Sequence, residues 1–413
     1  MTGASFRRSP KAAERLLVFT AVFCVLSCDR LRPASTLERQ FDDYVKLVAA
    51  LGERDPDSLD FYAGPDEWLA AVRRNPPALA DIRRKAGALA AGLQQPYHAA
   101  AQEARRAFLV GQLGAIVARA DVLSGTRLSF DEESRRLFGA DAGTRDLNRF
   151  VDVRRQLDDL LPGQGSLASR YAAFDRQYIV PFDRVPSLMI RAVDECRRRT
   201  LEHVALPGDA GVTVEYVHET PWSAFTRYRG RGRSTTQVNR DFALTVDRLL
   251  ELACHETYPG HHAINVLLNQ PAQPMYSPLT FRTEGAASYA ADLTFPGSSR
   301  LAVERELCRA AGLADADLER YLKVARLVDR LRWVQADIAR RYLDGRLEFV
   351  RAGRALEDEA LMPAESTEGM LKFFNRFRTY SVTYTAGYDA VEEYVGTSDE
   401  ASRWRAFRLW IGP

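Results

Sequence analysis

Residues 252–265 read LACHETYPGHHAIN and hold three of the chain's six histidines, His255, His261 and His262. Glu256 follows the first histidine directly, and Pro259-Gly260 interrupts a segment that otherwise has a helical pattern. Histidine with glutamate is the ligand composition of hydrolytic zinc sites, which leave one coordination position open for water. The stretch therefore predicts a metal site at a bend in the backbone.

The spacing of the histidines departs from the common helical arrangement. In H-E-x-x-H the second histidine comes four residues after the first, on the same helix face, and here Pro259 occupies that position. On an unbroken helix His262 would face the same way as His255 but roughly 10 Å further along. Proline bends a helix and glycine permits a tight turn, so we expect the pair to bring a later histidine back toward His255. Geometry alone does not choose between His261 and His262, and the unused ring is expected to bond substrate or a ligand.

A third ligand is expected from residues 281–293, FRTEGAASYAADL. Glu284 lies there beside Gly285, in an alanine-rich segment typical of a closely packed helix. Asp292 continues the same face, where it would either orient a histidine or lie in solvent. With one Zn²⁺ held by these groups, Glu256 is expected to act as the general base.

The remaining pattern predicts a mainly α fold. Helical periodicity runs through most of residues 29–205 and returns from 243 to 413, where residues 315–345 are expected to form one helix. Residues 206–242 alternate β-branched and polar side chains, which predicts a small β element with strands near 212–218 and 234–239. We expect an N-terminal helical region, 29–205, packed as one compact unit with a catalytic region, 206–413.

The N-terminus has the pattern of an export signal. A basic segment with Arg7, Arg8 and Lys11 precedes an apolar run that ends in Ser27-Cys28. A short apolar run before cysteine resembles the lipobox of bacterial lipoproteins, so residues 1–28 are expected to be a signal with Cys28 as the lipidated residue. Asp29 resembles the signal that retains such proteins at the inner membrane, facing the periplasm. A plain cleaved signal and a short membrane anchor are the alternatives.

Charge and cysteine content bear on the class of binding partner and on the number of free thiols. Residues 1–27 hold four of the 57 basic side chains and one of the 55 acidic ones, so the remainder is nearly neutral. A near-neutral body argues against a nucleic-acid partner. The expected mature chain has three further cysteines, an odd number that leaves at least one thiol free. Cys254 is interpreted as a small buried apolar residue.

Together these residues resemble a known family. HETYPGHH matches the H-E-x-x-P-G-H-H signature of a bacterial family in the gluzincin metallopeptidase clan. TEGAASYAADL resembles its second motif, Glu-Gly-Trp-Ala-x-Tyr-x-Glu, with Ala286 in place of the tryptophan and Ala291 in place of the final acid. TYTAGYDAVEEYVG resembles its C-terminal Pro-Gly-Gln-Ala motif loosely, with Ala386 and Tyr388 replacing the proline and glutamine.

The resemblance implies a helical, two-lobed zincin with one zinc ion and a peptide or small amide as substrate. It also implies an edge strand that pairs with the substrate, for which residues 234–239 are the candidate, with Gln237 and Asn239 as contacts. Tyr384 or Tyr388 would donate to the developing oxyanion, and Arg378 nearby would bind substrate. A structural hairpin and a packed aromatic stripe are the alternative interpretations of these two segments.

Two other functions remain open from the residues. A non-catalytic envelope scaffold could use the same fold, although the presence of Glu256 argues against lost activity. A di-iron carboxylate protein needs two Glu-x-x-His pairs. On the predicted helices the nearest pair is Glu251 and His255, spaced four apart.

Overall fold

A computed structural model describes residues 36–412 apart from residue 144. The chain separates into two compact units, Met1–Asp43 and Tyr44–Pro413, and apart from the start of the first described helix the description below concerns the second. The expected signal and Cys28 lie outside the described residues. None of the described helices combines the length and the apolar character needed to cross a bilayer.

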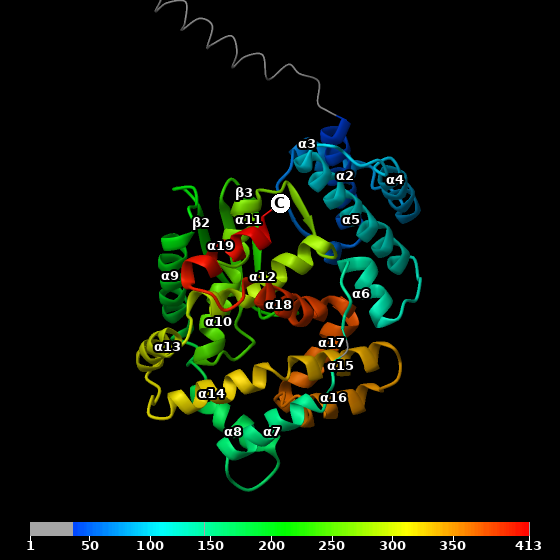
Figure 1. Ribbon diagram of the computed structural model, residues 1–413. Helices are drawn as coiled ribbons and strands as arrows, with labels where there is room; N and C mark the ends of the chain where they lie inside the picture. The colour runs from blue at the N-terminus through cyan, green and yellow to red at the C-terminus, as the bar shows by residue number, and fades with distance from the viewer. Residues whose placement is uncertain (1–35, 144, 413) are drawn as a thin grey trace, which may run out of the picture. The chain divides into compact units, whose positions relative to one another are not determined.

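The fold is mainly α, as the periodicity predicts (Figure 1). Ser129 accepts a hydrogen bond from the Glu132 N–H and caps α6 (Phe130–Phe138), and Pro186 lies in the first turn of α9 (Val185–His203). The elements before the β sheet are α2 (Thr36–Arg54), η2 (Pro56–Ser58), β1 (Leu59–Tyr62), α3 (Asp66–Arg74), α4 (Leu79–Ala91), α5 (Ala100–Leu123), α6 (Phe130–Phe138), α7 (Arg149–Leu160), α8 (Leu167–Asp175), η3 (Arg176–Tyr178) and α9 (Val185–His203).

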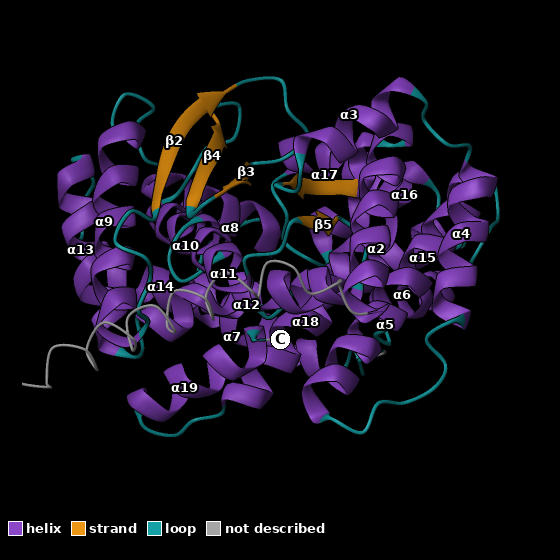
Figure 2. Cartoon of the chain, turned by 90° about the horizontal axis from the view of Figure 1, so that it is seen from above, coloured by secondary structure: helices purple, strands orange, loops and turns teal. Residues whose placement is uncertain are grey.

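The β element has three strands, β2 (Gly211–Val217), β3 (Ala224–Gly230) and β4 (Arg233–Asn239), in the order β2-β4-β3. β4 pairs in parallel with β2 and antiparallel with β3. The expectation that residues 234–239 form an edge strand is therefore wrong, because both edges of β4 are already hydrogen-bonded. The sheet lies beside α10 (Val246–Glu256) and α11 (His261–Leu268) (Figure 2).

The helical pattern after the sheet resolves into α10 (Val246–Glu256), α11 (His261–Leu268), β5 (Ala272–Pro274), α12 (Pro278–Thr294), α13 (Ser298–Ala311), α14 (Leu318–Asp329), α15 (Arg332–Leu343), α16 (Phe349–Asp358), α17 (Ala364–Phe377), η4 (Arg378–Ser381), α18 (Val382–Val395) and α19 (Glu400–Ile411). β5 pairs with β1 in a separate two-stranded sheet. The single helix expected over 315–345 is instead two, α14 and α15. They pack on different partners, α14 on α7 and α13, and α15 on α16, α17 and α18.

The core joins the two expected regions. The largest hydrophobic cluster combines side chains of α7 and α9 with side chains of α10 and α13 to α17. The most extensive helix packing is that of α12 on α18, near the centre of the Tyr44–Pro413 unit (Figure 1). Residues far apart in sequence therefore meet where α10, α11, α12 and α18 converge.

Candidate metal centre

The backbone bends at Pro259-Gly260, and the bend separates two helices rather than kinking one. α10 ends at Glu256, the Tyr258–Pro259 peptide bond is cis, and α11 begins at His261. The Gly260 N–H donates to the Cys254 carbonyl at 3.0 Å. A Cβ at Gly260 would lie 1.9 Å from the His255 carbonyl oxygen, so only glycine fits this approach.

The bend brings two imidazoles together. His255 Nε2 and His261 Nε2 lie 3.2 Å apart. Glu284 of α12 closes the group, with Oε2 at 3.6 Å from His255 Nε2 and Oε1 at 3.3 Å from His261 Nε2. One ligand atom from each of the three residues lies within 4.8 Å of the others. Two histidines and one glutamate are a zinc ligand set with a fourth position left for water or substrate.

Glu284 is placed by the close crossing of α12 and α18. A Cβ at Gly285 would lie 2.4 Å from the Gly387 carbonyl oxygen, so the two helix backbones meet where neither has a side chain. Across this crossing, the Tyr380 hydroxyl donates to Glu284 Oε1 at 2.7 Å and orients the carboxylate. Gly285 is therefore a packing requirement for the position of its neighbour.

His262 does not join the group. Its ring is fully buried, its Nδ1 lies 2.8 Å from Ser234 Oγ, and it packs edge-on against Tyr258. Burial lowers its pKa to about 4, so the ring is neutral. Of the two histidines that the sequence left open, the structure brings only His261 to His255, because α11 starts immediately after the bend.

The protonation states suit a cation at the centre. Burial lowers the pKa of His255 to about 4, which leaves a neutral ring with a free lone pair. Burial also opposes charge on His261, but the carboxylates of Glu284 and Glu256 outweigh it and raise the pKa of His261 to about 9. Without metal, the protonated His261 ring supplies positive charge between the Glu284 and Glu256 carboxylates. A divalent ion that displaces this proton would supply positive charge at the same place.

Glu256 stands next to this group as a buried carboxylate. It is 4% exposed, and its Oε2 has no hydrogen-bond partner among the described residues. Burial raises the pKa of Glu256 to about 7. Its main-chain carbonyl accepts a hydrogen bond from Thr226 of β3, which fixes the end of α10. The unpartnered oxygens of Glu256 and Glu284 fit a site completed by a metal ion and a water molecule.

The two tyrosines expected near the centre have different surroundings. The Tyr384 ring lies 6.4 Å from the His255 ring between centroids, and the carboxylates of Glu284 and Glu256 act on it electrostatically. Its hydroxyl makes no hydrogen bond within the described part of the chain. Tyr388, one turn on, instead donates to Asp292 at 2.7 Å under the Arg332 guanidinium. Tyr384 faces the centre, and the expectation for Tyr388 is wrong because its hydroxyl is used elsewhere.

Two of the other expected contacts, Arg378 and Asn239, are bonded to residues outside the centre. Arg378 donates to the buried carboxylate of Glu133. Asn239 donates to the carbonyls of Thr220 and Trp222, so it closes the loop between β2 and β3. Gln237 is half-buried in the middle strand of the sheet.

Two acids near the histidines also have other partners. Asp292 is bonded to Tyr388 and to Arg300, so it orients no histidine. Glu251, the acid of the di-iron alternative, is held by Arg300 and Arg248 and offers no free oxygen pair to a metal.

The structure adds a residue that the sequence analysis missed. Asp60 of β1 acts electrostatically on His261, Tyr380 and Tyr384, and the charges of Glu284 and Glu256 act on it in return. Burial raises the pKa of Asp60 to about 7. Nothing in its local sequence signals this position, because β1 comes to the site only by pairing with β5 and packing against β3.

A disulfide between Cys196 of α9 and Cys254 of α10 corrects the interpretation of Cys254 as a plain apolar residue. Both residues are fully buried, and the bond ties α9 to the helix that carries His255. Cys308 is a free, buried thiol, as the odd cysteine count requires. A disulfide is typical of proteins that fold outside the reducing cytosol.

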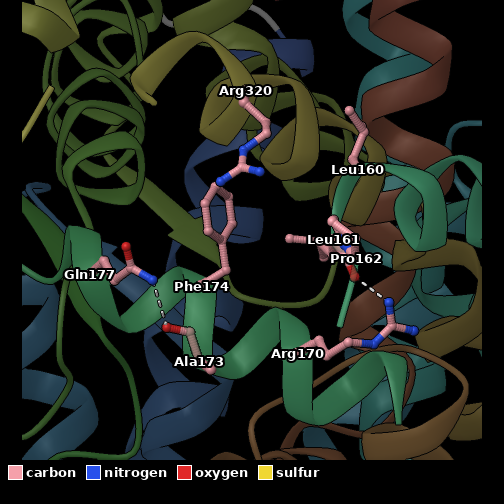
Figure 3. Close-up of a pocket in the computed structure, with 8 residues that line it drawn as sticks. All are labelled: Leu160, Leu161, Pro162, Arg170, Ala173, Phe174, Gln177 and Arg320. Carbon is pink, nitrogen blue, oxygen red and sulfur yellow. Dashed lines mark hydrogen bonds between the residues drawn. The ribbon is translucent and has the colours of Figure 1, made fainter. Parts of the chain in front are cut away.

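A separate surface pocket lies between the α7–α8 connection and α14 (Figure 3). Arg320 packs over the Phe174 ring, and Arg170 donates to the Leu161 carbonyl. None of the residues of the histidine centre lines it. Its lining residues are Leu160, Leu161, Pro162, Arg170, Ala173, Phe174, Gln177 and Arg320.

No family model matches the chain, and no curated protein matches it. Among solved structures it is similar to a candidate lipoprotein from Colwellia psychrerythraea, with 12% identity and a TM-score of 0.46 over 81% of this chain and 70% of that one. It is also similar to a candidate lipoprotein of unknown function from Shewanella oneidensis, with 13% identity and a TM-score of 0.47 over 98% of this chain and 92% of that one. Likeness at this level carries no statement about activity.

Proposed function

We propose that this chain is a zinc-dependent hydrolase, a metallopeptidase of gluzincin type that cleaves peptide or small amide bonds. The observation that carries the proposal is the convergence of His255, His261 and Glu284, with the buried carboxylate of Glu256 beside them, whose Oε2 has no partner among the described residues. A structural zinc site would be closed by four protein ligands, whereas this group offers three. The H-E-x-x-P-G-H-H resemblance supports the same reaction class.

Each site residue has a distinct role in this proposal. Zinc, when bound by the three ligands, would supply a Lewis acid that activates water and polarises the scissile carbonyl. Glu256 takes the proton of the attacking water and delivers it to the leaving amine, a task suited to a pKa near 7. Tyr384 donates its free hydroxyl to the developing oxyanion. Tyr380 holds the Glu284 carboxylate in its orientation.

The substrate-pairing strand of the proposal is β3 rather than β4. β3 is an edge strand of the sheet, and its Thr226 bonds the Glu256 carbonyl, so it runs next to the base. An extended peptide of any sequence can form main-chain hydrogen bonds along such an edge.

We further propose that the protein works outside the cytoplasm, anchored through a lipid on Cys28 to the inner membrane and facing the periplasm. The apolar segment before Cys28 and the Cys196–Cys254 disulfide support export. The binding partners implied are the membrane surface, a peptide or amide substrate and one zinc ion.

The proposal is tested by metal analysis and peptide-library digestion of wild type, His255→Ala and Glu256→Gln. Wild type is expected to bind one zinc and to cleave peptides in a chelator-sensitive way. Glu256→Gln should keep zinc and lose about 10²- to 10⁴-fold in kcat, the usual contribution of a general base. His255→Ala should lose both zinc and activity.

The same experiment can contradict the proposal. Zinc binding without cleavage in wild type would favour the non-catalytic scaffold. Wild type without bound metal would refute the hydrolase altogether.

A further inference from the structure

Asp60 lies at an irregularity of the short β1–β5 ladder. Leu59 pairs with Pro274 and Phe61 with Gln273, so the register shifts between them and Asp60 is the extra residue. A bulge leaves the extra residue without a ladder partner and redirects its side chain, which is why bulges are common beside active sites.

The segment that carries Asp60 is firmly held on both sides. The Ser58 carbonyl accepts from the Met275 N–H at 3.0 Å, and Arg119 donates to the Ser58 hydroxyl at 2.9 Å. On the other side, the buried Phe61 ring packs edge-on against Tyr228 and joins Val266 in one hydrophobic cluster. Val266 belongs to α11, the helix that begins with His261, so the position of Asp60 relative to the metal centre is fixed by packing.

The Asp60 carboxylate has no protein partner. Within residues 36–412, apart from 144, it makes no hydrogen bond or ion pair, and it is not one of the three residues grouped as metal ligands. Two cations act on it, His261 and Arg227. The proton of His261 would be displaced by a bound metal ion, and the Arg227 guanidinium lies over the Phe225 ring. A partly buried carboxylate beside a catalytic centre, without a cation of its own, is suited to bind a cation carried by the substrate.

We propose that Asp60 binds the ammonium group of a peptide substrate next to the scissile bond, namely the α-ammonium of the N-terminal residue, so that the enzyme acts as an aminopeptidase. This inference rests on the proposed hydrolase function. The α-ammonium is the peptide cation with a fixed separation from the first peptide carbonyl, one Cα away. When that carbonyl lies at the metal, the ammonium must therefore lie near the histidine centre, and the strand that carries Asp60 packs against the helix of His261 through Phe61 and Val266.

The activity test compares wild type, Asp60→Asn and the exposed control Asp66→Asn, all zinc-loaded. The peptides are Ala-Leu-Gly, its N-acetylated form and N-acetyl-Lys-Leu-Gly. Wild type should prefer the free N-terminus. Asp60→Asn should lower kcat/KM for Ala-Leu-Gly about 10- to 100-fold, mainly through KM, which is the usual effect of removing a hydrogen bond to a charged group. Asp66→Asn should behave as wild type.

A binding test needs no turnover. Calorimetric titration of Ala-Leu-Gly into Glu256→Gln should show tighter binding than its acetylated form, and Glu256→Gln with Asp60→Asn should bind both equally. Zinc content should be unchanged in every variant.

The outcomes separate this inference from the proposed function. Equal cleavage and binding of free and acetylated peptides by wild type would overturn the inference and leave the hydrolase intact. Loss of zinc in Asp60→Asn would make Asp60 a metal ligand and also overturn it. A preference for acetyl-lysyl peptide that disappears in Asp60→Asn would assign the carboxylate to a side-chain amine instead. Wild type that cleaves no peptide would refute both proposals.

Discussion

At the scale of single residues, side chains that look equivalent in the sequence have different contacts at the metal centre. His261 and His262 are neighbours, yet one faces His255 and the other bonds Ser234. Tyr384 and Tyr388 are one helical turn apart, yet only Tyr384 keeps its hydroxyl free within the described chain. In both pairs the choice follows from where a neighbouring element supplies a partner.

The tyrosine pair gives a matched test of the oxyanion donor. Tyr384→Phe removes a hydroxyl that faces the centre, so kcat should fall about 10²-fold with zinc content unchanged. Tyr388→Phe removes a hydroxyl bonded to Asp292, so activity should remain and stability should fall by about 1 kcal/mol. Steady-state kinetics with urea unfolding measure both. Equal kinetic effects of the two variants would contradict the assignment.

A buried glutamate on α13 predicts a pH dependence of stability. Glu304 is fully buried and bonded to Arg300, but Arg300 is shared with Glu251, and burial raises the pKa of Glu304 from about 4.5 to about 8. An acid whose pKa is higher in the folded than in the unfolded state stabilises the fold fully below pH 4.5, and this contribution is lost as the pH rises through about 8.

Glu304→Gln removes this titration. The free energy of unfolding of the variant minus that of wild type should therefore rise by on the order of 5 kcal/mol between acid and alkaline pH. Urea unfolding at both pH extremes measures it, with the exposed Glu306→Gln as control. A difference that stays constant with pH would refute the effect.

At the scale of elements, the site depends on two close backbone approaches. Gly260 allows α10 and α11 to meet at the bend, and Gly285 allows α12 to meet α18. The first sets the separation of the imidazoles, and the second brings Glu284 together with Tyr380. The Cys196–Cys254 disulfide adds a covalent tie between α9 and α10, one residue before His255.

Gly285→Ala tests the helix crossing. Its Cβ would lie 2.4 Å from the Gly387 carbonyl, so α12 and α18 must move apart. We expect a loss of about 1–3 kcal/mol, the usual cost of overpacking, together with weaker zinc binding. Gly369→Ala in α17 is the control, since nothing lies within 4 Å of its added Cβ and alanine favours a helix. Zinc titration and thermal melts measure both, and equal stability of the two variants would contradict this account.

At the scale of the whole molecule, the centre gathers residues from β1, α10, α11, α12, η4 and α18, which span most of the described chain. The site can therefore exist only when the Tyr44–Pro413 unit is folded. Metal binding and folding are linked in such a case, because the ion binds the native state and not the unfolded chain.

This linkage predicts a zinc-dependent melting temperature. Zinc at a hundredfold excess over its Kd should stabilise wild type by about 3 kcal/mol, and a chelator should reverse the gain. His261→Ala should abolish the response, whereas His262→Ala should keep it despite any loss of basal stability. Thermal melts with and without chelator decide this. Loss of the response only in His262→Ala would reverse the ligand assignment.

The sequence alone determined the features that depend on neighbouring residues. The mainly α fold follows from helical periodicity and the bend from Pro259-Gly260, because each acts within a few residues. The same reasoning selected His255, Glu256 and Glu284, which the structure brings together. It also predicted the close-packed helix around Gly285.

Tertiary structure decided the features that depend on contacts between residues distant in sequence. In the sheet, β4 is the central strand. Cys196 and Cys254 form a disulfide, and the segment expected to be a single helix is two helices, α14 and α15, that pack on different partners. Asp60 reached the centre only through the pairing of β1 with β5, almost two hundred residues from His255 in sequence. Local spacing fixes how a backbone turns, but only packing between separate elements fixes which side chains share one point in space.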